Sequence, residues 1–145
     1  MWRAILIALL ISLGPSACSK ERDLPEAYRR LPVPPGLLDS AAARESGRKL
    51  FLTSCALCHG EKADGRGVRR EGLSTPPRDF TNPSWRAGTT PRRVFFAIRE
   101  GVRGTPMPGW KSFSDAETWD LVAFLLSEAH GRAAHVSHNP AVPTA

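Results

Sequence analysis

Residues 54–60 read Ser-Cys-Ala-Leu-Cys-His-Gly and contain the motif that most limits what the chain can fold into. Cys55 and Cys58 are separated by two residues, and His59 follows the second cysteine directly. Three chemistries use such an arrangement: a redox-active dithiol, part of a zinc site, and covalent attachment of haem. The surrounding sequence has to distinguish between them.

The spacing of Cys55, Cys58 and His59 is typical of c-type haem attachment. Two thiols on one short turn can add to the two vinyl groups of the porphyrin, and the adjacent imidazole can bind the iron. A thioredoxin-like dithiol would instead follow a strand, and no alternating strand pattern of useful length is present. A zinc site would need a further ligand, but the remaining histidines lie near the C-terminus. The sequence therefore predicts one covalently bound haem c with His59 as an axial iron ligand.

Met107 is the only methionine apart from Met1, and it lies between Pro106 and Pro108. The prolines fix backbone φ and favour an irregular loop, which makes this methionine a poor filler of a helical core. We predict that its thioether is the second axial ligand of the iron. A labile thioether would open the iron to a gas or a peroxide, so a haem-based gas sensor or peroxidase-like protein is the alternative function.

Three segments have helical patterns, and each begins with residues that cap helix N-termini. The expected capping residues are Ser40, Thr90 and Ser114. The first helix should lead into Cys55, and the second should stop at Gly101. The third is apolar on nearly all sides and should be buried. We predict an all-α fold with three main helices and long loops.

The 145 residues leave room for one domain with flanking segments. Residues 1–17 combine a basic start, an apolar run and a small-residue break, which is typical of a signal peptide and too short to span a membrane comfortably. Residues 18–38 are rich in proline and charge and are predicted to be an anchor or linker segment. Residues 39–130 hold the motif and the helices. Residues 131–145 lack large apolar residues and are predicted to be a disordered tail.

Two alternatives stay open at the N-terminal end. Residues 18–38 could form an ordered arm that packs on the domain through Tyr28 and Leu31. Cys18 follows the small-residue break and resembles the lipid-modified cysteine of a bacterial lipoprotein. Pro15 stands where such signals usually carry leucine, so cleavage without lipidation is the alternative.

Residues 60–89 are rich in glycine and proline and predict a long irregular loop. A loop of this length does not normally belong inside a compact domain. A large apolar prosthetic group would give the loop something to pack against.

The charge of the chain bears on its partners. The sequence has 20 Lys and Arg against 14 Asp and Glu, a net charge of +6. The basic residues are scattered and no aromatic-basic motif accompanies them, so nucleic-acid binding is not predicted. The charge suits docking to an acidic protein. A metal-handling role is a further alternative, through the histidines near the C-terminus, His130, His135 and His138.

From about Ser40 to Ala129 the sequence resembles a class I cytochrome c of bacterial type. Gly47–Phe51 resembles the first helix of that family and Trp119–Leu125 its last helix. The resemblance implies a monomeric monohaem electron carrier with His/Met iron ligation and no enzymatic activity. It also implies an exported protein in the periplasm, free or lipid-anchored to a membrane. Its partners would be redox proteins such as a membrane oxidase or reductase complex.

In the family the first and last helices cross, with a small residue at the contact. Transferred to this chain, the resemblance implies that Gly47 and Phe51 meet Leu121 and Phe124.

The resemblance also implies roles for residues of the long loop. A proline carbonyl would accept a hydrogen bond from His59, and either Pro76 or Pro77 could supply it. Arg78 and Trp85 would donate to the haem propionates. Rigidifying the loop is the alternative role of the prolines, and plain surface charge is that of Arg78.

Overall fold

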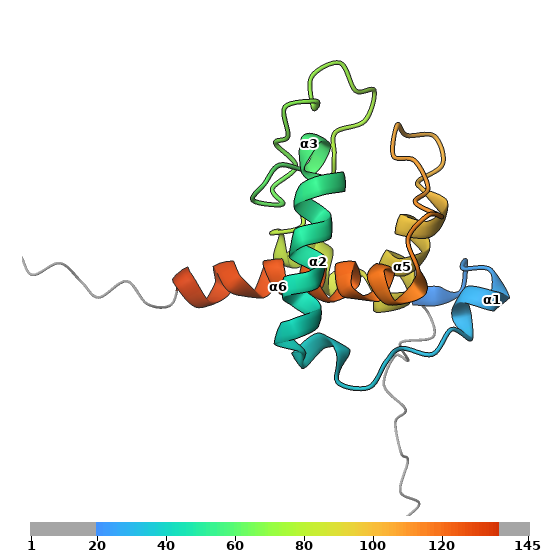
Figure 1. Cartoon of the computed structure of the whole chain (residues 1–145). Helices are drawn as coiled ribbons and strands as arrows, with labels where there is room; N and C mark the ends of the chain where they lie inside the picture. Colours follow the sequence, from blue (N-terminus) through green and yellow to red (C-terminus); the bar gives the residue numbers. More distant parts are fainter. Residues whose placement is uncertain (1–19, 137–145) are drawn as a thin grey trace, which may run out of the picture.

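Two crossed helices organise the fold (Figure 1). The computed structural model describes residues 20–136. Its elements are, in order, α1 (Glu26–Arg29), the 3-10 helix η2 (Leu37–Asp39), α2 (Ala41–Ser54), α3 (Ala56–His59), α4 (Pro83–Gly88), α5 (Pro91–Glu100) and α6 (Asp115–Val136). α2 crosses α6, and α5 packs against α6. The described residues contain no strand, so the predicted all-α class is confirmed.

The three main helices begin where the sequence predicts. The side chains of Ser40 and Thr90 each accept a hydrogen bond from the amide three residues further on, at 3.1 and 3.3 Å. Ser114 and Glu117 form the reciprocal capping box: Ser114 Oγ accepts from the Glu117 amide at 3.2 Å, and Glu117 accepts from the Ser114 amide at 2.8 Å. These bonds satisfy backbone donors that a helix start otherwise leaves unpaired.

α2 and α6 approach each other at a glycine. A Cβ atom on Gly47 would lie 2.0 Å from the carbonyl oxygen of Asp120 and 2.9 Å from the amide nitrogen of Leu121. One turn later, the ring of Phe51 lies 5.2 Å from that of Phe124, centroid to centroid. The contact inferred from the resemblance, with the small residue at the crossing, is therefore confirmed.

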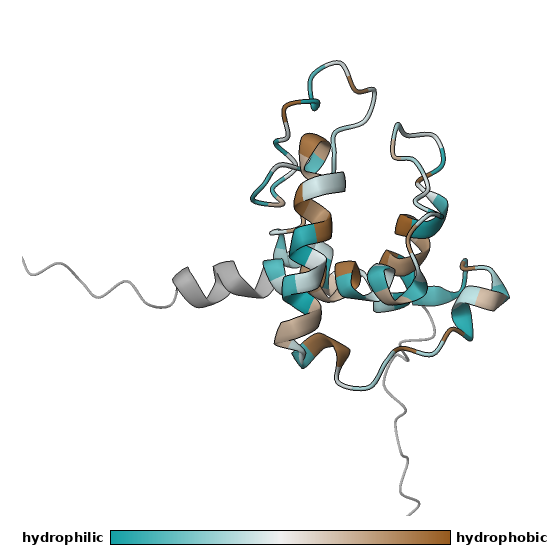
Figure 2. Cartoon of the chain, viewed as in Figure 1, coloured by the Kyte–Doolittle hydropathy of each residue, from teal (hydrophilic) through white to brown (hydrophobic). Residues whose placement is uncertain are grey.

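The centre of α6 is buried on nearly every side, as its sequence predicts. Residues 121–126 are all buried, and α5 adds Val94, Phe95 and Ile98 to the same core. The ring of Phe95 lies 4.5 Å from that of Trp119. Figure 2 shows the hydrophobic segments of α2, α5 and α6 where the helices meet. Each such large apolar side chain contributes roughly 1.5–3 kcal/mol on burial.

The described part of the segment predicted as an anchor or linker is instead an ordered arm. Leu24 and Leu37 are buried. The ring of Tyr28 packs edge-on against that of Phe96 in α5, at 4.8 Å. The linker interpretation is therefore wrong for residues 20–38, and the arm interpretation describes them.

Charged residues hold this arm along α5. Arg93 donates two hydrogen bonds to the Asp23 carboxylate, at 2.5 and 2.7 Å, and Arg92 donates to the Leu31 carbonyl at 2.7 Å. Arg92 also lies 3.4 Å from a Glu21 carboxylate oxygen. The charges that predicted a solvated linker have partners about seventy residues away, which local sequence does not reveal.

Helix α6 continues to Val136, six residues into the segment predicted as a tail. The helix-forming Ala133 and Ala134 lie in this extension. Residues 1–17, Cys18 and residues 137–145 lie outside the described residues, so the signal peptide, the lipidation of Cys18 and the rest of the tail stay predictions.

Among residues 20–136, no helix has the combination of length and apolar character needed to cross a membrane.

Replacement of Gly47 by alanine should destabilise the fold, because the new methyl would collide with the backbone of α6. We expect Gly47→Ala to lower the free energy of unfolding by about 3 kcal/mol, the upper range for overpacking. Denaturant unfolding followed by circular dichroism measures it. Gly88→Ala is the matched control, since a Cβ on Gly88 meets nothing within 4 Å. Equal stability of the two variants would contradict the crossing.

Candidate functional site

The two cysteines of the motif lie on one helical turn. α2 ends at Ser54, and Cys55 is the N-cap of the short helix α3. Its main-chain carbonyl accepts hydrogen bonds from the amides of Cys58 and His59, at 3.1 and 2.9 Å. Both thiols are half-buried, and neither is in a disulfide. Burial, and after it the neighbouring Cys58, raises the pKa of Cys55 to about 11. A thiol held protonated at neutral pH does not suit a reactive dithiol, in which the thiolate is the nucleophile.

His59 is buried, and its ring is oriented by one main-chain bond. Its Nδ1 atom lies 3.1 Å from the carbonyl oxygen of Arg78. A carbonyl only accepts, so Nδ1 carries the proton and Nε2 keeps a free lone pair. Burial lowers the pKa of His59, and the bond to Arg78 opposes this in part. The neutral imidazole is the form that can bind a metal.

The acceptor of the histidine bond corrects the prediction made for the prolines. Neither Pro76 nor Pro77 supplies it; the carbonyl belongs to Arg78. The Pro77 carbonyl points instead at Gly65, where a Cβ atom would lie 2.6 Å from it. Neighbouring carbonyls of an extended segment point to opposite sides, so the position after Pro77 faces His59.

The first half of the long loop closes the end of α3. Four loop amides donate to the last four carbonyls of this helix region, which are otherwise unpaired at a helix C-terminus. The pairs are Gly60 to Ala56 at 2.8 Å, Arg69 to Leu57 at 2.8 Å, Gly67 to Cys58 at 3.1 Å and Gly65 to His59 at 2.8 Å. The loop therefore has a structural purpose of its own, in addition to any group it packs against.

Aromatic rings connect His59 to α4. The ring of Phe80 lies 4.7 Å from that of His59, and Trp85 packs edge-on against Phe80 at 4.9 Å. The Phe80 amide donates to the Ala63 carbonyl at 2.8 Å, which ties this segment to the loop. The Phe80 ring therefore lies between Trp85 and His59. The side chain of Arg78, the other predicted propionate donor, is exposed.

Met107 is half-buried in a tight loop between α5 and α6. The Val102 amide donates to the Met107 carbonyl at 3.2 Å, and the Met107 amide donates to Thr105 Oγ1 at 3.2 Å. A Cβ atom on Gly101, which has φ +75°, would lie 2.6 Å from the Met107 carbonyl. Local turns therefore preset the backbone at this methionine. In Figure 1 this loop and the α3 end project to the same side of the α2–α6 crossing.

One buried donor was not predicted from the sequence. The Nε atom of Arg86 is buried and, among the described residues, has no hydrogen-bond partner. A buried guanidinium nitrogen needs an acceptor, and the carboxylate of a haem propionate is of the right kind. Arg86 directly follows Trp85 in α4. Because Trp85 was predicted as a propionate donor, this neighbouring position could have indicated Arg86 from the sequence.

The side chains present fit a haem c. Cys55 and Cys58 offer two thiols on one turn, His59 offers a free Nε2, and the Met107 loop has a fixed shape. Among residues 20–128, whose side chains the structure describes, no three His, Cys, Asp or Glu side chains form a group that could hold a metal ion, so the zinc alternative gains no support there. The metal-handling alternative stays a prediction, because the side chains of His130, His135 and His138 lie outside the part of the chain whose side chains are described.

Comparison with known proteins identifies one matching family and several similar proteins. The family described as cytochrome C oxidase, cbb3-type, subunit III matches residues 42–125. Thiosulfate dehydrogenase of Stutzerimonas stutzeri (strain A1501) is 30% identical over 107 residues, 73% of this chain and 33% of that protein. The Cbb3-type cytochrome c oxidase subunit CcoP of Azospirillum brasilense is 30% identical over 93 residues, 63% of this chain and 30% of that protein.

A solved structure also resembles the fold. It belongs to the reducing HAO-like protein complex of Kuenenia stuttgartiensis, with a TM-score of 0.58 and 29% sequence identity. The similarity covers 68% of this chain and 47% of that one. The chain thus spans about a third of the length of these curated relatives and about half of this structural one.

The matched segment contains nearly all of α2, the haem motif, the long loop, the Met107 loop and the first half of α6. This defines the chain as a c-type cytochrome with one covalently bound haem c. It belongs to the family of cbb3-type cytochrome c oxidase subunit III, whose match extends over more than half of its residues.

The packing of the long loop against α3 can be tested at Gly67. A Cβ atom there would lie 2.3 Å from the Leu57 carbonyl oxygen and 2.5 Å from the Cys58 carbonyl carbon. Gly67→Ala should uncap the helix and lower the free energy of unfolding by roughly 2–3 kcal/mol. Denaturant unfolding and the yield of covalently bound haem measure the effect. Val68→Ala, at the exposed neighbouring position, should stay within about 0.5 kcal/mol of wild type.

Proposed function

We propose that the protein carries single electrons between redox partners, with His59 and Met107 as the axial ligands of its haem iron. The observation that supports this best is the bond from His59 Nδ1 to the Arg78 carbonyl, which leaves Nε2 free on the turn that holds both cysteines. A histidine oriented by a main-chain acceptor is the arrangement expected of a metal ligand.

The chain's own residues would keep the iron site rigid. Cys55 and Cys58 would fix the porphyrin through thioethers. Trp85 and Arg86 would donate to a haem propionate, which would give the buried Arg86 Nε the acceptor it lacks among the described residues. The haem supplies the one-electron chemistry, with its iron alternating between the ferric and ferrous states. The Arg78 carbonyl holds the histidine, and the turns around Thr105 hold the methionine backbone. Two such fixed ligands require little rearrangement between oxidation states and leave no position for a substrate, so we infer a carrier rather than an enzyme.

Partner docking would use the end of the molecule that carries the motif. Leu57 and Val68 are exposed there, by 50% and 84%, and line one shallow hollow with the basic Lys62 and Arg66 and the acidic Glu61 and Asp64. Exposed apolar side chains favour a protein partner, and the net charge of +6 on the chain favours an acidic one. We infer that this partner is a redox protein such as a membrane oxidase or reductase complex. We also infer that the cytochrome binds it as a monomer.

The two curated relatives bear the names of a thiosulfate dehydrogenase and an oxidase subunit, so electron delivery to or from an enzyme fits the family. From the predicted N-terminal signal we infer that the domain is exported to the periplasm, where Cys18 would be available for lipid anchoring.

Replacement of Met107 tests the ligand set. We expect wild-type ferric protein to show the weak far-red absorption of thioether-ligated iron. Met107→Ala should lose this band, keep its haem bound through denaturation, bind imidazole, and have a lower reduction potential because the soft ligand is gone. A wild-type protein that lacks the band and binds gases or peroxide as readily as the variant would favour the sensor or peroxidase-like alternative instead.

Two charge reversals distinguish the effect of the docking surface's position from the effect of net charge. Arg70 lies in the basic loop beside Val68, and Arg30 is exposed on the arm at α1. Arg70→Glu should slow oxidation by anionic hexacyanoferrate(III) several-fold at low salt. Arg30→Glu, with the same change in net charge, should have a smaller effect. The difference should vanish at high salt, because screening shortens the reach of the charges. Equal rates in both variants would contradict docking at this end.

A further inference from the structure

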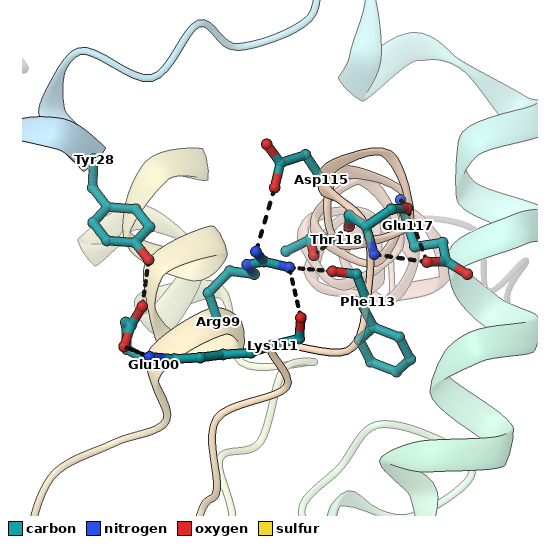
Figure 3. A network of polar contacts seen from close by, with 9 residues as sticks. Tyr28, Arg99, Glu100, Lys111, Phe113, Asp115, Glu117 and Thr118 are labelled. Atoms are coloured by element: carbon teal, nitrogen blue, oxygen red, sulfur yellow. Dashed lines mark hydrogen bonds and ion pairs between the residues drawn. The ribbon is translucent and has the colours of Figure 1, made fainter.

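The loop that carries Met107 is attached to α5 by more than its own turns. Figure 3 shows that the last two residues of α5, Arg99 and Glu100, reach across to the returning half of this loop. Arg99 donates to the carbonyl of Phe113 and lies 3.7 Å from the Asp115 carboxylate at the start of α6. The loop is therefore held at its far end by a guanidinium that also contacts the next helix.

Glu100 joins the same loop to the N-terminal arm. Its Oε2 atom lies 3.0 Å from Lys111 Nζ, and its Oε1 atom accepts a hydrogen bond of 2.6 Å from the Tyr28 hydroxyl (Figure 3). Tyr28 precedes Glu100 by 72 residues. One carboxylate thus connects the arm, the end of α5 and the methionine loop.

The bond between Tyr28 and Glu100 favours the neutral hydroxyl and the ionised carboxylate. Burial, and then the bond to Glu100, raises the pKa of Tyr28 to about 12. The bonds from Tyr28 and then Lys111 lower the pKa of Glu100. Arg99 and Asp115 are the other charged groups that face this pair. A neutral hydroxyl donor and an ionised acceptor make the stronger, charge-assisted kind of hydrogen bond.

The bond from Tyr28 matters because the ion pair beside it is weak. The Lys111 side chain is 70% exposed, and exposed pairs contribute little when they alone must hold two mobile side chains. The Tyr28 hydroxyl fixes the Glu100 carboxylate, and the Tyr28 ring is itself fixed against Phe96. The Glu100 side chain is then already ordered, so its ion pair with Lys111 costs less conformational entropy.

We propose that Tyr28 is a positioning residue for the axial ligand Met107, acting through Glu100 and Lys111. The local turns set the shape of the methionine loop, and this network sets its place relative to α5 and the arm. The inference rests on the proposed function, since it requires that Met107 binds the iron. Loss of the Tyr28 hydroxyl should raise the fraction of molecules in which the methionine is off the iron.

Imidazole binding to the ferric holoprotein measures that fraction. Imidazole competes with the thioether, so its apparent affinity rises with the population in which the methionine has left. Tyr28→Phe keeps the ring packing and removes only the hydroxyl; we expect it to bind imidazole about fivefold more tightly than wild type. Glu100→Gln should shift the affinity in the same direction. The absorption spectrum reports binding, and the far-red band reports the thioether directly.

Two comparisons separate positioning from a general loss of stability. Asp23→Asn weakens the arm at the opposite end of α5, where it pairs with Arg93, and should leave the imidazole affinity unchanged. In a Met107→Ala background, Tyr28→Phe should also have no effect, because no methionine remains to be positioned.

The outcomes are distinguishable. A wild-type affinity in Tyr28→Phe, an equal shift in Asp23→Asn, or a shift that persists without Met107 would overturn the positioning role. A wild-type protein that lacks the far-red band and binds imidazole as tightly as Met107→Ala would overturn the ligand set itself, and the positioning role with it.

Discussion

The close approach of α2 and α6 at Gly47 is the constraint on which the remaining geometry depends. Without a side chain there, the α2 backbone reaches the α6 backbone at Asp120, and Phe51 enters the core beside Phe124. α2 then ends just beyond the crossing, and the haem motif begins at its end. Because the Met107 loop leads directly into α6, the same crossing also sets where the two proposed iron ligands lie relative to each other.

The two sides of the haem site are held in different ways. The histidine side depends on the main chain: loop amides close α3, and the Arg78 carbonyl orients the ring. Side-chain identity matters little for such bonds, apart from positions such as Gly67 that must lack a Cβ. The methionine side combines short turns with a side-chain network through Glu100. Single substitutions can therefore tune the methionine side without unfolding the domain.

The sequence predicted those features that depend on residues close together in the chain. The starts of the main helices follow from side chains that bond amides three residues away, as at Ser40, and the motif at Cys55 follows from the spacing its chemistry needs. The Arg78 carbonyl was missed because the direction of each carbonyl in an extended loop is set by distant packing. The ordered arm was only the alternative to a linker for a related reason: Asp23 looks solvated until Arg93 is brought beside it.

The ordered arm also changes what counts as the folding unit. The family match begins at residue 42, but buried leucines and ion pairs from residue 21 onward belong to the same packed body. A boundary drawn at the family match would remove Leu24 and Leu37 from the core and leave two arginines of α5 without their acidic partners. When this domain is fused to another protein, the junction should lie upstream of the arm. The direction of the arm along α5 would then determine how the haem is oriented relative to the fused protein.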